Sequence, residues 1–163
     1  MSALDPSATP SVASPQVPKS HKRLSGQHEC TLDEKGRLSI PAEFRTILGL
    51  VEGSELKVSR HINLPCVVVY RPDAFDALLD QAERSGTKEG KALIRVVGGT
   101  ARTMVLDKAG RISVPGPFRD HADLSGPAFV VGMDQHLEVW TPEAWNARYG
   151  VSNFEAMDFS DWM

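Results

Sequence analysis

The sequence reads TLDEKGRLSIPAEFR at residues 31–45 and, 74 positions later, VLDKAGRISVPGPFR at residues 105–119. Aligned without gaps, the two segments are identical at eight of fifteen positions, whereas average composition would give roughly one identity. A second pair of segments, VVVYRPDAFDAL at residues 67–78 and LEVWTPEAWNAR at residues 137–148, extends the similarity. The 163-residue chain therefore contains an internal duplication, and its fold is predicted from the repeated unit.

Each copy of the repeat carries the same local signals in the same order. Partly alternating, β-prone residues precede an Asp…Gly loop, and RLSI or RISV follows with the alternation of a half-buried strand. Because glycine adopts positive φ readily, the two strands are predicted to form a hairpin. A short helix is predicted after Pro41, but Gly116 and Pro117 oppose one at the matching place in the second copy. Two further strands and a second helix, opening at Pro72 or Pro142, complete each copy.

The repeated unit of short strands and small helices is too small to form a core alone. Two copies packed about a pseudo-two-fold axis bury both apolar faces, which predicts an α+β, mainly β, fold. The residues KALIRVV, within the junction, fit either a helix or a strand, and a helix that ends at Gly98 and Gly99 is favoured. The predicted organisation is a disordered Pro/Ser/Ala-rich tail (1–24), a first repeat (25–83), a junction (84–99), a second repeat (100–150) and an acidic C-terminal tail (151–163).

The charge of the chain is unevenly distributed. The net charge is −3, which by itself argues mildly against a nucleic-acid partner. Residues 84–119, however, contain eight Lys and Arg against two acidic residues, whereas residues 120–163 contain one Arg against eight acidic residues. This asymmetry predicts one basic face and an acidic tail. Solvated surface charge without a partner remains the alternative interpretation.

The remaining sequence signals argue against a membrane protein and an enzyme. No apolar run approaches the roughly 18 residues of a membrane span. Cys30 and Cys66 have neither metal nor disulfide spacing, which favours a reducing cytoplasm. The five histidines show no metal-ligand spacing, and no nucleophile triad or Gly-rich phosphate loop is apparent. The sequence therefore predicts no catalytic residues, no metal and no cofactor.

The two loops, DEKGR and DKAGR, carry the residues that favour DNA binding. A protruding antiparallel ribbon fits the major groove, where arginine pairs with guanine and lysine reaches phosphate. The aspartates are expected to cap the turn or to orient the arginine through a hydrogen bond. The glycines are expected to allow the backbone conformation of the turn. The candidate DNA-binding residues are Lys35, Arg37, Lys108 and Arg111; the candidate loop-orienting residues are Asp33, Gly36, Asp107 and Gly110; additional candidate contacts are Arg45 and Arg119. The alternative is that the Asp-x-x-Gly-Arg pattern only stabilises a hairpin turn and binds no ligand, which explains the same residues equally simply.

The segments LDEKGRLSIPAEFR and LDKAGRISVPGPFR resemble the MraZ family of bacterial transcriptional regulators over about residues 25–150. The resemblance implies two AbrB-like swapped-hairpin units forming a pseudo-two-fold β-barrel. It also implies that the Asp-x-x-x-Arg loops at 33–37 and 107–111 belong to the DNA-contacting surface.

The same resemblance implies a ring-like homo-oligomer, often octameric, that binds double-stranded DNA at short direct repeats in a promoter. The promoter belongs to a cell-division and cell-wall gene cluster that includes the regulator's own gene, and members commonly act as repressors. Such a protein is expected to be cytoplasmic and nucleoid-associated, with no membrane partner.

Two features depart from the family pattern. In the second loop Ala109 stands where the first has Lys35, and Lys108 moves the positive charge one place earlier, so DEKGR is expected to be the better base reader. The tail at residues 1–24 precedes the usual start of the family. The acidic, aromatic segment SNFEAMDFSDWM at 152–163 supports a rival hypothesis, an antitoxin-like protein-binding module of the same fold.

Overall fold

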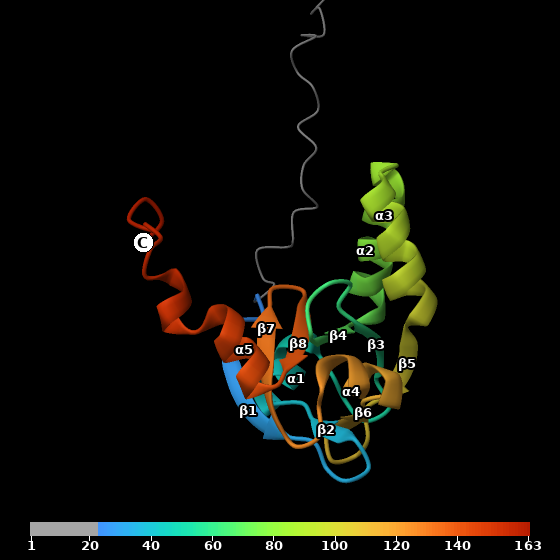
Figure 1. The fold of residues 1–163 in the computed structure, drawn as a ribbon. Coiled ribbons are helices and arrows are strands. Elements are labelled where there is room, and N and C mark those ends of the chain that lie inside the picture. The colour runs from blue at the N-terminus through green and yellow to red at the C-terminus, as the bar shows by residue number, and fades with distance from the viewer. Residues whose placement is uncertain (1–22) are drawn as a thin grey trace, which may run out of the picture.

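The computed structural model describes residues 23–163 (Figure 1). The predicted disordered tail spans residues 1–24, and residues 1–22 of it lie outside the described residues. Leu24 is only 2% exposed, and its backbone forms an antiparallel bridge with Asp134. Arg23 forms an ion pair with the side chain of Asp134, 2.8 Å between Nε and Oδ1. Residues 23 and 24 therefore belong to the folded part of the chain.

The order of helices and strands is repeated along the chain. The first copy contains β1 (Gln27–Thr31), β2 (Arg37–Ser39), α1 (Ala42–Leu48), β3 (Glu55–Arg60), β4 (Val67–Tyr70) and α2 (Pro72–Ser85). The second contains β5 (Arg102–Val105), β6 (Arg111–Ser113), α4 (Gly116–Ala122), β7 (Pro127–Met133), β8 (His136–Trp140) and α5 (Pro142–Tyr149), followed by the 3₁₀ turn η2 (Val151–Phe154). Between them lie α3 (Lys88–Leu93) and the π-helical turn η1 (Ile94–Gly98), which confirms the helical prediction for this segment. The fold is α+β and mainly β.

The strands form a six-stranded sheet with the order β1-β7-β8-β4-β3-β5 and a two-stranded sheet of β2 and β6. The counterparts in the two copies are β1 and β5, β3 and β7, and β4 and β8. If each strand is replaced by its counterpart, the same order is obtained read from the opposite edge, as a pseudo-two-fold arrangement requires. The sheet is open, because β1 and β5 are its outer strands and no pairing among the described residues joins them. A closed β-barrel, which the family resemblance implies, is not found in this pairing.

The simple hairpin predicted around each loop is wrong. Strand β1 pairs with β7 and β2 pairs with β6, so the strands on either side of the first loop pair with the other copy. Strand β5 likewise pairs with β3. The physical reason lies in the core: pairing β2 with β6 places Leu38 opposite Ile112, and both are at most 1% exposed. An alternating pattern specifies a buried face but does not specify which strand covers it.

One hydrophobic core is shared by the two copies. Phe44 on α1 and Phe118 on α4 are 0% and 4% exposed, so both rings belong to this core. Helix α4 forms although Gly116 and Pro117 lie at its start. The N–H groups in the first turn of a helix have no acceptor within the helix, so a proline there costs no helical hydrogen bond. A smaller cluster, containing Cys66 and Trp140, packs against Trp145 on α5.

The elements extend from the body in distinct directions (Figure 1). Helices α2 and α3 project together from one end, and the loops that precede β2 and β6 lie at the other end. Residues 151–163 lead away from α5 as an arm. Within residues 23–163, no helix is both long enough and apolar enough to cross a bilayer.

Candidate nucleic-acid interface

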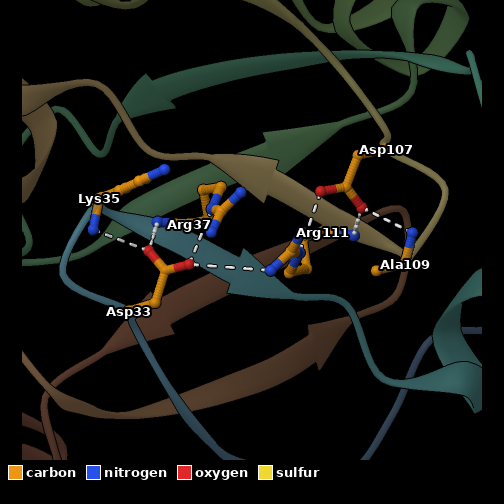
Figure 2. Close-up of polar contacts among 6 residues, drawn as sticks. All are labelled: Asp33, Lys35, Arg37, Asp107, Ala109 and Arg111. Atoms are coloured by element: carbon orange, nitrogen blue, oxygen red, sulfur yellow. Dashed lines mark hydrogen bonds and ion pairs between the residues drawn. The ribbon is translucent and has the colours of Figure 1, made fainter.

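The carboxylate of Asp33 organises the first loop. Its Oδ1 accepts hydrogen bonds from the backbone N–H groups of Lys35 and Arg37, both at 2.9 Å. Its Oδ2 accepts a hydrogen bond from Nε of Arg37 at 2.7 Å. The turn is closed by the N–H of Gly36, which donates to the carbonyl of Asp33 at 2.9 Å. One side chain therefore sets both the path of the loop and the direction of the arginine (Figure 2).

The second loop repeats this geometry. Oδ1 of Asp107 accepts from the N–H groups of Ala109 and Arg111 at 2.9 and 2.8 Å, and its Oδ2 accepts from Nε of Arg111 at 2.9 Å. Ala109 takes the place of Lys35 without loss of structure, because the bond to the aspartate comes from the backbone N–H in both loops.

Both loop aspartates are held ionised. The backbone N–H of Arg37 is the main cause that lowers the pKa of Asp33; partial desolvation opposes it, and the Arg37 guanidinium adds to the lowering. The backbone N–H of Arg111 lowers the pKa of Asp107 in the same way. A carboxylate that accepts several N–H bonds is stabilised in its charged form. Each arginine therefore keeps a charged acceptor at neutral pH, which fixes the guanidinium and offsets much of its charge.

The pairing of β2 with β6 brings the two loops together. Because Leu38 and Ile112 face the core, Arg37 and Arg111 both lie on the outer face of the two-stranded sheet, as diagonal neighbours. Nη1 of Arg111 is 3.9 Å from Oδ2 of Asp33, and the two arginine side chains are 32% and 33% exposed. Figure 2 shows them side by side between the two aspartates. We call residues 33–37 and 107–111 together the paired-loop surface.

The other candidate residues occupy two different environments. Lys35 and Lys108 are exposed within the paired-loop surface. Gly36 and Gly110 are buried with φ of 75° and 78°, a conformation that favours glycine. Arg45 and Arg119 are only partly exposed, and their Nε atoms donate to the carbonyls of Ile40 and Val114, each at 3.0 Å.

Sequence reasoning missed the bonds that join each loop to the other copy. The N–H of Ile40 donates to the carbonyl of Gly110 at 2.9 Å, and the N–H of Val114 donates to the carbonyl of Gly36 at 2.8 Å. These are backbone groups, so no residue type reveals them. The repeated Pro and Arg downstream of each loop were the available signal that the whole fifteen-residue segment acts as a unit.

The family described as "MraZ protein, putative antitoxin-like" matches residues 24–96 and 98–161. A protein named "Transcriptional regulator MraZ" from Roseiflexus sp. (strain RS-1) is 34% identical over 122 residues, which cover 74% of this chain and 82% of that one. Its namesake from Marinobacter nauticus is 34% identical over 78% of this chain and 87% of the relative. The namesake from Salinispora arenicola is 32% identical over 83% and 94%.

A solved structure, the solution structure of PHS018 from Pyrococcus horikoshii, aligns with 72% of this chain and 88% of that chain at 16% identity. The TM-score of 0.32 is too low to bear on the fold. The family match is much more extensive, because it includes both copies of the duplicated unit and nearly all the described residues. The chain belongs to the MraZ family.

Proposed function

We propose that this protein is a DNA-binding transcriptional regulator that reads duplex DNA with its paired-loop surface. The observation that carries the proposal is the placement of Arg37 and Arg111 side by side, each held by an ionised aspartate. A guanidinium fixed in this way is prepared for a bidentate contact with the O6 and N7 atoms of guanine. The relatives named above are transcriptional regulators by name, which supports this function over catalysis.

The charge of the surface determines how it would bind. Asp33, Glu34 and Asp107 offset three of the four positive charges of the two loops. Binding is therefore expected to depend on hydrogen bonds to base edges, with Lys35 and Lys108 supplying the phosphate contacts. The ordered arginines specify sequence, and the exposed lysines supply the salt-dependent part of the affinity.

The finer parts of the proposal follow from membership in the family. The target is a set of short direct repeats in the promoter of a cell-division and cell-wall gene cluster, including the protein's own promoter, and the effect is repression. The protein acts as a ring-like homo-oligomer, octameric in the simplest case, in the cytoplasm and at the nucleoid. Light scattering of the purified full-length chain measures the assembly, and footprinting on its own upstream DNA locates the site.

The experiment that tests DNA binding is a fluorescence anisotropy titration with duplex DNA from that upstream region, against a shuffled duplex. The logarithm of the affinity should fall linearly with the logarithm of the salt concentration, because each phosphate contact releases counterions. Lys35→Ala and Lys108→Ala should each reduce the slope by about 1 per protomer in contact with DNA. Lys57→Ala, outside the paired-loop surface, is the matched control. Absence of any preference for the upstream duplex at low salt would refute the proposal.

A second candidate function is an antitoxin-like protein-binding module, and the arm at residues 151–163 favours it. Val151, Trp162 and Met163 on this arm are 88%, 85% and 102% exposed, and three acidic residues are interspersed among its aromatic side chains. Exposed apolar side chains next to acids are typical of protein-docking segments. Pull-down from a lysate with the full chain and with residues 151–163 deleted separates the two functions. If the arm docks a protein, the deletion should abolish binding of that protein and leave DNA binding intact.

A further inference from the structure

The arginine at the end of each fifteen-residue segment lies against the loop of the opposite copy. A Cβ atom added to Gly36 would lie 2.8 Å from both Cζ and Nε of Arg119. A Cβ atom added to Gly110 would lie 2.8 Å from Cζ and Nη1 of Arg45. Each guanidinium is therefore in direct contact with the glycine of the other loop, in space that any side chain would fill. This contact is reciprocal, as the pseudo-two-fold arrangement requires.

Each arginine is anchored to the strand end that touches the same glycine. Nε of Arg119 donates to the carbonyl of Val114, whose own N–H donates to the carbonyl of Gly36. Nε of Arg45 donates to the carbonyl of Ile40, whose own N–H donates to the carbonyl of Gly110. The opposite loop is thus held from two directions, by a backbone hydrogen bond and by a planar side chain packed on its glycine.

We propose that Arg45 and Arg119 are positioning residues that act crosswise: Arg119 holds the loop at 33–37, and Arg45 holds the loop at 107–111. The two loops then form one rigid unit: Asp33 and Asp107 shape each loop from within its own copy, and the opposite copy holds that loop in place. The inference rests on the proposed function only for its effect on DNA, since the contacts exist within the chain itself. It assigns to Arg45 and Arg119 a role different from the direct DNA contact expected from the sequence.

The crosswise arrangement also explains why glycine occupies both loops. The positive φ of Gly36 and Gly110 disfavours any side chain. A side chain at either glycine would also displace the guanidinium of the opposite arginine from its bond to the carbonyl of Ile40 or Val114. Lysine cannot replace the arginine, because it lacks both the planar group that packs on the glycine and the Nε donor.

Amide hydrogen exchange on the DNA-free, full-length protein tests the proposal. Arg119→Ala should accelerate exchange at the amides of Lys35, Gly36 and Arg37 by about tenfold or more, because the loop opens locally without global unfolding. The loop at 107–111 should change far less. Arg45→Ala should give the reverse pattern, with Ala109, Gly110 and Arg111 affected.

Arg71→Ala is the matched control. Nη1 of Arg71 donates to the carbonyl of Leu48 at 2.9 Å, so this variant also removes an arginine bonded to a backbone carbonyl, but one that lies beside the turn at Gly49 and not against either loop of the paired-loop surface. It should leave exchange in both loops unchanged. If Arg119→Ala opens the loop of its own copy, or neither loop, the crosswise assignment is wrong.

A glycine substitution gives a second, independent test by thermal unfolding. Gly36→Ala should lower the melting temperature, and adding Arg119→Ala should recover part of the loss because the obstructing guanidinium is gone. Adding Arg45→Ala to Gly36→Ala should give only the sum of the two single effects, as expected for sites that share no contact. Equal coupling of Gly36→Ala to both arginines would overturn the proposal.

DNA affinity distinguishes positioning from contact. Arg119→Ala should weaken binding in an Arg111→Ala background, where the first loop still reads DNA, and should have little further effect in an Arg37→Ala background. An Arg119→Ala loss of the same size in both backgrounds, with unchanged exchange in the loop, would show that Arg119 touches DNA itself. If the wild-type protein binds no DNA, the exchange and melting experiments still decide the crosswise contact.

Discussion

At the scale of single residues, each loop works through one aspartate and one arginine. Asp33 accepts two backbone N–H groups and the Nε of Arg37, and Asp107 does the same for the second loop. The bond to Nε uses one edge of the guanidinium and fixes its plane. An arginine restrained in this way loses less conformational entropy on binding than one moving freely in solvent.

Replacing the loop arginines should separate DNA reading from folding. Arg37→Ala and Arg111→Ala should each weaken specific DNA binding by roughly 1–3 kcal/mol per bidentate contact at one site. Both should leave the melting temperature nearly unchanged, because partly exposed ion pairs contribute little to the free energy of unfolding. Anisotropy titrations and thermal unfolding on the same preparations measure the two effects. An Arg37→Ala protein that unfolds readily but binds DNA normally when folded would make the arginine a structural residue only.

Stability should decrease in weakly acidic solution because of His61. Burial is the main cause that lowers the pKa of His61; the nearby Glu138 opposes this effect, and His136 and His121 add to the lowering. The unfolded chain therefore takes up a proton at a higher pH than the folded protein does. The free energy of unfolding should fall as the pH drops below about 6.5, the ordinary pKa of histidine.

The variant His61→Asn tests this pH dependence. Nδ1 of His61 accepts hydrogen bonds from the backbone N–H groups of Asn63 and Leu64, and an amide oxygen can take over as acceptor. Urea unfolding between pH 7 and pH 5 should show a smaller loss of stability in the variant. Burial raises the pKa of Glu138, but hydrogen bonds from His136 and Trp140, together with the charges of His136 and His61, outweigh burial and lower it, so Glu138 acts only in more acidic solution. An unchanged slope in His61→Asn would assign the effect to another group.

At the scale of elements, the short helices α1 and α4 carry the rings that join the two copies. Phe44 and Phe118 belong to one hydrophobic cluster with residues of β2 and β6 beneath the paired-loop surface. Each helix ends in a left-handed residue, Gly49 in the first copy and Asp123 in the second. The paired-loop surface therefore rests on a core built equally by both copies.

Truncating these rings should destabilise the whole protein. Phe44→Ala and Phe118→Ala should each lower the free energy of unfolding by about 3–5 kcal/mol, because both the transfer energy and a cavity are involved. Urea unfolding monitored by tryptophan fluorescence and by circular dichroism should report a single transition in both cases. Two separate transitions would mean that the copies fold independently, contrary to their shared core.

At the scale of the whole molecule, duplication makes the chain a covalent pseudo-dimer with two loops on one surface. Two loops offer few base contacts, which is too little for a specific site. In the ring-like assembly that we propose, contacts after the first become intramolecular, which raises avidity by roughly 10²–10⁴ when the spacing fits. The operator should then contain several repeats about one helical turn apart, roughly 10 bp, so that successive protomers meet the same face of the DNA.

Operators of different length test this multivalent binding. Affinity should rise far more than statistically from one repeat to two and three, and a half-turn insertion between repeats should cancel the gain. Titrations with the three duplexes and the inserted variant, at one salt concentration, provide the measurement. Equal affinity for one and three repeats would mean that each pair of loops reads DNA alone.

The sequence by itself determined the features that depend on neighbours along the chain. The duplication, the aspartate and glycine of each turn and the helical starts at Pro72 and Pro142 were all predicted, and the structure shows a turn or a helix at each of these places. Turns and helix starts are set by local hydrogen bonds and backbone conformation, so a few adjacent residues are enough to reveal them.

Only the tertiary structure decided which segments meet. The partner of β2 is β6 rather than β1, and the partner of the Gly36 loop is Arg119 rather than Arg45. An alternating pattern predicts that one face of a strand is buried, and an arginine supplies five hydrogen-bond donors. Neither signal specifies which segment of the chain will be the partner. In a duplicated chain every local signal occurs twice, so pairing within a copy and pairing across copies satisfy the same pattern. The choice was made by the shared core, because only the crossed pairing buries Leu38 and Ile112 against each other.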